Sequence, residues 1–308
     1  MKKVFSMLLA LLLLVNGCAA VFAEEAAVPD FRVASPAGAP GLALATLAAA
    51  NPDRYVFLAA ETITAEFSAG TADFIIAPLN AGAKLYKAGK STYKLGAVVS
   101  WGNLFIASQR PDFKLEDING ADITLFAENT INSSVVLFVL AANGIEPASV
   151  SYLGGAANTQ QLLLSDENAI VVTAEPALTA ARIKNENVTG YSVNELYKAA
   201  TGYDGFTQAG LFIRAETIET RSEEVDAFLK MVAESCGKCE TDLEAVAEAA
   251  VALELLPNKK VAVSAIPGCA IRFVPAWDAK EQVEITANID LAQFGGAVPA
   301  DDFYYGAK

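Results

Sequence analysis

The sequence of 308 residues predicts an α/β fold. From Phe31 onward, short runs rich in β-branched and aromatic residues alternate with stretches of helical periodicity, which is the pattern of parallel strands joined by crossover helices. About 290 residues remain after a short N-terminal leader, enough for one large domain or two domains of ordinary size. No internal repeat is present.

The leader comprises residues 1–18 and has the three parts of an export signal. Lys2 and Lys3 form its positive end, an apolar run extends from Val4 to Val15, and small residues lead to Cys18. The run is too short to span a bilayer, which takes about 20 apolar residues. Val-Asn-Gly-Cys resembles a bacterial lipobox, in which the cysteine becomes the lipidated first residue of a membrane-anchored lipoprotein. Cleavage of a signal peptide after Ala23 is the alternative, and both place the protein outside the cytoplasm.

Residues 19–30 are Ala-rich and are expected to form a tether. The strands expected after it are residues 31–35, 55–59, 73–77, 95–100, 104–108, 122–126, 150–153, 169–173 and 209–214. The helices expected between them are residues 41–50, 62–69, 80–88, 133–143, 158–164 and 175–184. Beyond Arg214 the strand pattern fades, and helices are expected over residues 223–234, 240–255 and 277–294.

Two interruptions divide the chain. Pro111 and Asp112 follow the strand at 104–108, and the segment Phe206–Gly210 precedes the strand at 209–214. If both are hinges, residues 31–110 plus 207–308 form one discontinuous lobe, and residues 111–206 form a second, inserted lobe.

Charge and histidine content exclude several functions. Removing Lys2 and Lys3 leaves 20 basic and 36 acidic side chains, a net charge of about −16, which disfavours nucleic acid or an anionic bilayer as a partner. The chain has no histidine, so Ser-His-Asp and Cys-His mechanisms are excluded and the commonest metal ligand is missing. A mechanism that uses two carboxylates remains open, but no motif nominates a pair. The sequence therefore predicts a protein that is not an enzyme and holds no metal or cofactor.

Three cysteines follow the leader. Cys236 and Cys239 have C-x-x-C spacing between two helical patterns, with no preceding strand and no second pair, which disfavours a redox motif or a zinc site. We expect a Cys236–Cys239 disulfide at a corner between helices, because the compartment is oxidising, with Cys269 buried as a small apolar residue. A disulfide between Cys269 and one of the other two stays open.

Candidate site residues lie in loops that follow strands, because ligands of open α/β sheets bind at the carboxyl ends of strands, near helix N-termini. The first loop is the Pro/Gly-rich segment from Ser35 to Gly41, which either admits a ligand to backbone amides or is an ordinary turn. In the second, Asn80 either caps a helix or contacts a ligand. In the third, Trp101 either stacks on a ligand or belongs to the core.

The fourth loop carries the most specific pattern. Thr130, Asn132, Ser133 and Ser134 crowd hydroxyls and amides around one helix start, where capping needs only one of them, so the surplus suggests a ligand. Further along, Glu175 ends a strand before Pro176, where it either faces a cleft or complements the helix dipole.

The order of these segments resembles the substrate-binding proteins of ABC importers, and most of all their nitrate/sulfonate/taurine and thiamine-pyrimidine-precursor group. The segments that carry the resemblance are Ser-Pro-Ala-Gly-Ala-Pro-Gly at 35–41, Ala-Asp-Phe-Ile-Ile-Ala-Pro-Leu-Asn at 72–80, Leu-Glu-Asp-Ile-Asn-Gly-Ala-Asp-Ile at 115–123 and Ala-Glu-Pro at 174–176. The resemblance implies the type II periplasmic-binding-protein fold, in which two α/β lobes clamp a ligand. It covers residues from about Phe31 to Tyr305.

The resemblance also implies the walls of the cleft. One wall would hold Ser35, Gly38, Ala39, Pro40, Leu79, Asn80, Trp101 and Gly102, and the other Asn129, Thr130, Asn132, Ser133 and Glu175. These loops contain no Arg or Lys, unlike the best-known members, so a neutral or weakly cationic, planar solute is expected, stacked on Trp101 and paired with Glu175.

The function expected is that of a monomeric, extracytoplasmic, lipid-anchored solute-binding protein that delivers a small organic solute to an ABC permease. Two alternatives stay open, because a fold does not fix a function. One is an enzyme of pyrimidine-precursor synthesis on the same fold, and the other is a sensory or adhesion module with a degenerate cleft.

Overall fold

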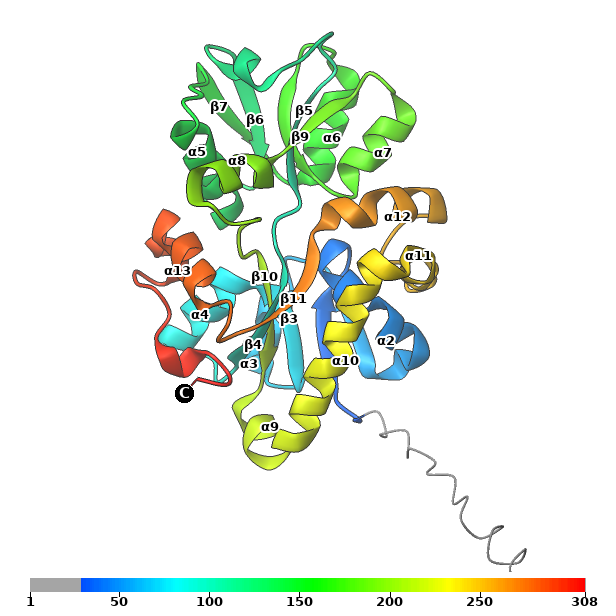
Figure 1. Ribbon diagram of the computed structural model, residues 1–308, viewed down its shortest axis with the longest axis vertical. Coiled ribbons are helices and arrows are strands. Elements are labelled where there is room, and N and C mark those ends of the chain that lie inside the picture. Colours follow the sequence, from blue (N-terminus) through cyan, green and yellow to red (C-terminus); the bar gives the residue numbers. More distant parts are fainter. Residues whose placement is uncertain (1–28, 308) are drawn as a thin grey trace, which may run out of the picture.

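The computed structural model describes residues 29–307. The predicted signal peptide, lipidation at Cys18, the alternative cleavage site and residues 19–28 of the tether lie outside the described residues. Two β-sheets occupy separate lobes, one above the other in Figure 1. None of the helices in residues 29–307 is long and apolar enough to span a membrane.

The first sheet has six strands in the order β11-β4-β10-β3-β1-β2. In chain order these are β1 (Val33–Pro36), β2 (Tyr55–Leu58), β3 (Phe74–Pro78), β4 (Lys94–Ser100), β10 (Ala209–Ile213) and β11 (Ile271–Pro275). The second sheet has five strands in the order β7-β6-β8-β5-β9. These are β5 (Leu104–Ser108), β6 (Asp122–Phe126), β7 (Ser149–Leu153), β8 (Ile170–Ala174) and β9 (Thr189–Ser192).

The chain crosses between the sheets twice, at residues 101–103 and 202–208. In each sheet, the strand that follows a crossing is antiparallel to its neighbours: β10 to β3 and β4, and β5 to β8 and β9. β1, β2 and β3 pair in parallel, as do β6, β7 and β8. The carboxyl ends of β3, β4, β6 and β8 therefore face the gap between the sheets, and β5 and β10 start there, which forces them to run the opposite way.

Helices cover both sheets. In the first lobe they are α2 (Ala45–Ala50), α3 (Glu66–Ala69), α4 (Leu79–Lys87), α9 (Ala215–Thr220), α10 (Ser222–Thr241), α11 (Leu243–Ala252), α12 (Lys259–Ala265) and α13 (Lys280–Ile289). In the second they are α5 (Ile131–Ala142), α6 (Ala156–Ser165), α7 (Ala177–Lys184) and α8 (Val193–Thr201). Short 3₁₀ helices add η1 (Ala39–Leu44), η2 (Pro52–Arg54), η3 (Ile63–Ala65), η4 (Leu115–Ile118), η5 (Ile266–Cys269), η6 (Leu291–Phe294) and η7 (Asp301–Phe303).

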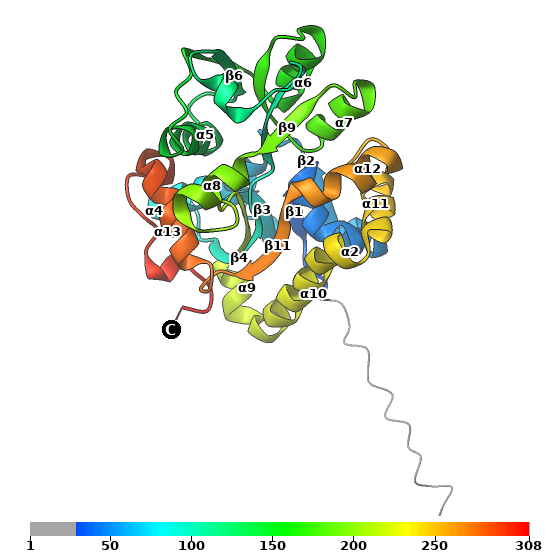
Figure 2. The ribbon, with the colours of Figure 1, turned by 45° about the horizontal axis from the view of Figure 1, so that its top comes forward.

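The lobes touch on both sides of the gap between them. Figure 2 shows α7 of the second lobe beside α12 of the first, and α5 beside α13 on the opposite side. One buried hydrophobic cluster continues from the first lobe through Trp101 and Leu104 to Ile123 and Val135 of the second. The first crossing and the part of the second crossing from Gly205 to Thr207 are therefore buried rather than exposed linkers.

Two features of the predicted organisation were wrong. β5, which the interruption at Pro111 assigned to the first lobe, pairs with β8 and β9 of the second sheet, so the first crossing precedes Leu104. Beyond Arg214 the chain still supplies a strand, β11, at the edge of the first sheet. Each expected strand has a counterpart within a few residues, whereas β9 and β11 were missed.

The predicted Cys236–Cys239 disulfide was also wrong. α10 continues to Thr241, so both residues lie inside one helix rather than at a corner. Both thiols are buried and free, as is that of Cys269. Burial raises the pKa of Cys236 and of Cys269, and raises the pKa of Cys239 to about 12.

Candidate functional site

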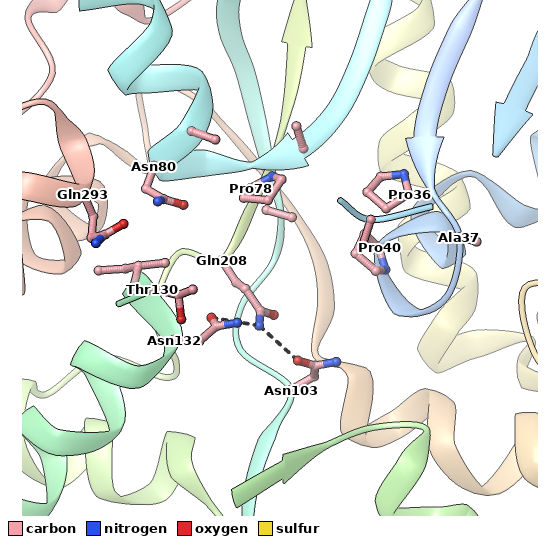
Figure 3. A pocket seen from close by; sticks show the side chains of 15 residues that line it. Pro36, Ala37, Pro40, Pro78, Asn80, Asn103, Thr130, Asn132, Gln208 and Gln293 are labelled. Carbon is pink, nitrogen blue, oxygen red and sulfur yellow. Dashed lines mark hydrogen bonds between the residues drawn. The ribbon is translucent and has the colours of Figure 1, made fainter. Parts of the chain in front are cut away.

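A cleft with a volume of about 360 Å³ lies between the two lobes (Figure 3). Its volume is at the lower end of the range for small-molecule sites. Both lobes and both crossings contribute to its wall, which consists of Pro36, Ala37, Pro40, Ala60, Ala77, Pro78, Asn80, Ala81, Asn103, Thr130, Ile131, Asn132, Gln208, Ala209 and Gln293.

The lining combines apolar side chains with carboxamides. Prolines, alanines and one isoleucine make up the apolar part, and no lining residue carries a charge. The polar part is one hydroxyl and five amides: Thr130, Asn80, Asn103, Asn132, Gln208 and Gln293. Such a wall offers hydrogen bonds of both kinds without an ionic partner.

Asn80 enters the cleft from the first turn of α4. β3 stops at Pro78, and the Leu79 N–H donates to the carbonyl of Gln208 at 3.0 Å, which ties this turn to the second crossing. The side-chain oxygen of Asn80 is buried and has no hydrogen-bond partner among the described residues. A buried acceptor left unpaired costs about 1–3 kcal/mol, which a donor on a bound molecule would offset.

Gln208 links the two crossings at the centre of the cleft. Its Nε2 donates to Oδ1 of Asn103 at 3.0 Å and to Oδ1 of Asn132 at 3.3 Å (Figure 3), while its Oε1 accepts from Ser100 Oγ at 3.0 Å. Asn103 in turn donates its Nδ2 to the carbonyl of Glu175 at 2.9 Å. These amides are therefore held in place by the protein itself.

The start of α5 forms the wall of the second lobe. Thr130 and Ser133 bond reciprocally in a capping box, with Thr130 N–H donating to Ser133 Oγ at 3.2 Å. Asn132 points to Gln208, and Ser134 bonds outside the cleft to Asp290. The surplus of polar side chains noted in the sequence is thus largely explained by contacts within the protein.

Gln293 closes the cleft from the C-terminal part of the first lobe. It lies in η6, which follows α13, and its Nε2 donates to the carbonyl of Asn129 in the second lobe at 2.9 Å. One side chain thus both lines the cleft and bonds the opposite lobe.

Four of the predicted site residues line the cleft, namely Pro40, Asn80, Thr130 and Asn132. Gly38, Ala39, Leu79, Asn129 and Ser133 are their neighbours in sequence but are not in the lining, and Ser35 is buried with its Oγ donating to the carbonyl of Pro36. The sequence reading missed Asn103, Gln208 and Gln293. Asn103 lies in the same loop as Trp101, shortly after β4, so the strand-end criterion could have found it. Gln208 precedes β10 and Gln293 lies in a late helix, so that criterion does not reach them.

Trp101 lies outside the cleft, contrary to the expected stacking role. Its side chain is 1% exposed, its Nε1 donates to the carbonyl of Arg272 at 2.8 Å, and the Arg272 guanidinium covers its ring at 4.3 Å. Gly102 is equally enclosed, since a Cβ there would lie 2.5 Å from Phe206. This tryptophan is part of the buried cluster at the first crossing.

Glu175 also faces away from the cleft. Its two carboxylate oxygens accept from the N–H and the hydroxyl of Thr179, at 3.0 and 2.9 Å, so it satisfies an N–H group in the first turn of α7. Burial raises the pKa of Glu175, and the bonds from Thr179 oppose that shift. The expected pairing of this carboxylate with a cationic solute has no support in the geometry.

The chemistry of the cleft is that of recognition. Its lining offers amides, a hydroxyl and the first turns of α4 and α5, whose N–H groups favour acceptors. No group of three or more Asp, Glu or Cys side chains within residues 29–307 is arranged to hold a metal ion.

No protein-family model matches the chain, and no curated protein matches it in sequence. Solved structures match the chain in fold. An ABC transporter protein from Parabacteroides distasonis superposes with a TM-score of 0.78 at 19% identity, covering 90% of this chain and 99% of its own. The periplasmic aliphatic sulphonate binding protein SsuA from Escherichia coli gives 0.68 at 16%, covering 91% and 93%.

A Candida albicans protein described as having the generic periplasmic binding protein fold gives a TM-score of 0.53 at 12% identity, covering 89% of this chain and 93% of its own. The structural neighbours thus include substrate-binding proteins of ABC transporters, as the sequence resemblance predicted. At these identities the likeness establishes the fold, and the chain has the periplasmic binding protein fold.

Proposed function

We propose that this chain is the extracytoplasmic solute-binding lipoprotein of an ABC importer, which binds a small organic solute between its lobes and delivers it to a permease. The observation that carries the proposal is a cleft walled by both lobes and both crossings. The names of the structural neighbours support the transport role.

The mechanism follows from the two-sided wall. A solute that contacts Asn80 on the first lobe and Asn132 on the second gains both sets of contacts only when the lobes are together. Its differential affinity then shifts the population toward the closed form, which the permease would recognise. We assign residues 29–100 with 209–307 to one moving body and residues 104–201 to the other, on the basis of sheet membership.

A binding role agrees with the lining better than an enzymatic one. The amides and the hydroxyl of the cleft orient a molecule but provide no nucleophile–base pair. The charge of the chain, −14 in total, argues against a nucleic acid as the bound molecule.

The experiment combines a ligand screen with scattering. Purified mature protein is screened by thermal shift against amines, vitamins, pyrimidines, sulfonates, amino acids and neutral amides. A solute present at 100 times its Kd should stabilise the fold by about 2.7 kcal/mol. A hit should also reduce the radius of gyration in small-angle scattering. A saturating hit with an unchanged scattering profile would contradict clamping between lobes, and a screen without any hit would count against solute binding.

Lipid anchoring has its own test. Cys18→Ser should move the protein from the membrane to the soluble fraction of cells that express it. A variant that remains membrane-bound, or a mature N-terminus at Glu24 in mass spectrometry, would overturn lipidation at Cys18. A variant at the neighbouring Ala20, Ala20→Ser, is the matched control and should stay membrane-bound.

A further inference from the structure

We infer that the cleft selects an uncharged solute with an amide-type edge, where an N–H lies beside a carbonyl. The Asn80 side chain would bind this edge through two hydrogen bonds. The inference deepens the proposed function and rests on it. It specifies both a chemical class for the solute and one residue that sets specificity.

The first argument is charge. None of the residues that line the cleft is acidic or basic. A carboxylate, sulfonate or ammonium group that enters it would lose hydration without gaining a counter-charge, and burying an unpaired charge is strongly unfavourable. The first turns of α4 and α5 provide only partial positive charge, which suits a carbonyl oxygen.

The second argument is that two of the carboxamides in the cleft already form hydrogen bonds within the protein. Gln208 uses both ends of its carboxamide, in bonds to Ser100, Asn103 and Asn132. Asn103 likewise has a partner at each end, with its oxygen bonded to Gln208 and its nitrogen to the carbonyl of Glu175. Both ends of these two carboxamides thus already have a partner within the protein.

Asn80 differs from them. Its oxygen is buried without a partner, and its nitrogen forms no hydrogen bond with any described residue. A free carboxamide presents one acceptor beside one donor, so it pairs with two bonds to any group that shows a donor beside an acceptor. Asparagine reads the edge of adenine in nucleic acids by the same two-bond geometry.

Two further side chains of the cleft also have a donor or an acceptor free for a solute. Asn132 engages only its oxygen, leaving its Nδ2 donor, and Gln293 engages only its nitrogen, leaving its Oε1 acceptor. Pro36, Pro40 and Pro78 give the remaining wall an apolar face. A compact cyclic amide or ureide matches both requirements, since it has polar edges and apolar CH₂ faces.

The test uses the soluble Cys18→Ser protein and defined probes. The neutral probes are 2-piperidinone, hydantoin and glycine anhydride, each measured beside its fully N-methylated counterpart, in which every N–H is replaced. The charged probes are taurine, nitrate and putrescine. Affinity is measured by calorimetric titration. We expect at least one N–H probe to bind, and its N-methylated counterpart to bind about tenfold or more weakly, because methylation removes the donor that pairs with Asn80.

Variants then assign the contact. Two substitutions, Asn80→Leu and Asn80→Ser, should each lower the affinity for the N–H probe by about tenfold or more. The affinity for its methylated counterpart should stay nearly unchanged. Asn288→Leu, at an exposed amide on α13, is the matched control and should change neither. Melting temperatures of the unliganded variants check the fold, and Asn80→Ser remains informative if the leucine variant does not fold.

Each other outcome overturns the inference. Two such outcomes concern the solute class: a charged probe binds in preference to all cyclic amides, or no cyclic amide binds. Two others concern the contact: methylated and unmethylated probes bind equally, or both Asn80 variants keep the wild-type affinity. Failure of this inference is distinct from failure of the proposed function, because a different solute that reduces the radius of gyration would preserve the function while refuting the amide-edge assignment.

Discussion

Ser134 Oγ donates a 2.7 Å hydrogen bond to Asp290 Oδ2, joining the first turn of α5 in the second lobe to the start of η6 in the first. The neighbouring bond from Gln293 Nε2 to the carbonyl of Asn129 spans the same side of the cleft. On the opposite side, Gly268 lies against Glu175, where a Cβ would come within 2.9 Å of the Glu175 Cγ. The lobes thus meet on both flanks.

Ser134→Ala should loosen the contact between the lobes. The variant loses about 0.5–1.5 kcal/mol of cross-lobe stabilisation and leaves an acceptor of Asp290 unpaired. Its unliganded radius of gyration should exceed that of the wild type in small-angle scattering. Ser165→Ala, which removes a hydroxyl bonded only within its own helix, is the control, and equal radii for all three proteins would contradict a role for this bond in closure.

Trp101→Ala should destabilise the fold. The side chain is 1% exposed in the buried cluster at the first crossing, so truncation leaves a cavity and should lower the free energy of unfolding by about 3–5 kcal/mol. Urea unfolding measures the loss. The control is Trp277→Ala, at a half-buried ring, which should lower the free energy of unfolding by less. A Trp101→Ala protein with native stability but impaired solute binding would instead support the stacking role.

Glu175→Gln should flatten the pH dependence of stability. Burial raises the pKa of Glu175 above its ordinary value of 4.5, so the folded state keeps a proton that the unfolded state has lost. The contribution of Glu175 to the free energy of unfolding therefore falls as pH rises from about 4.5 through the folded-state pKa, and is constant above it. Glutamine cannot titrate, so the variant should gain stability relative to the wild type over this range. Urea midpoints that differ equally at about pH 4 and about pH 8 would contradict the shift.

The three buried cysteines should resist thiol reagents. Burial raises the pKa of each thiol, which lowers both the thiolate fraction and access. In the Cys18→Ser protein, Ellman's reagent should find no reactive thiol under native conditions and three after unfolding. A single thiol after unfolding would demonstrate a disulfide between two of these three cysteines, and peptide mapping would show whether the pair is Cys236–Cys239 or includes Cys269.

The sequence predicted strands well wherever a strand is buried. β3, with its unbroken apolar run Phe74–Pro78, has both faces covered and is recognisable without any structure. β9 is an edge strand of half-buried Thr-Gly-Tyr-Ser, and β11 is an edge strand ending in Pro275. Edge position alone does not hide a strand, since the edge strands β2 and β7 were predicted; β9 contains a glycine and β11 ends in a proline, and both residues weaken a strand pattern.

The cleft was predictable only in part, for a related reason. Asn80 and Asn132 begin helices near the carboxyl ends of strands, a position from which ligand contact can be inferred. Gln208 and Gln293 reach the cleft through tertiary structure, which no local pattern encodes. Trp101 was misread because a tryptophan in a connection looks the same whether it is exposed or, as here, covered by Arg272 from distant β11.

The two crossings pack directly on each other, and this fixes the geometry of any opening motion. Gly205 lies against the carbonyl of Trp101, Gly102 against Phe206, and Gln208 bonds Asn103. If one lobe rotates on the other, we expect the rotation axis to pass close to these residues, and displacement to grow with distance from it. Asn103 and Gln208, at the floor of the cleft, would barely move, while the outer rims of the lobes would swing through the longest arcs. A small displacement of the residues at the cleft would then accompany a larger displacement of the outer surfaces of the lobes.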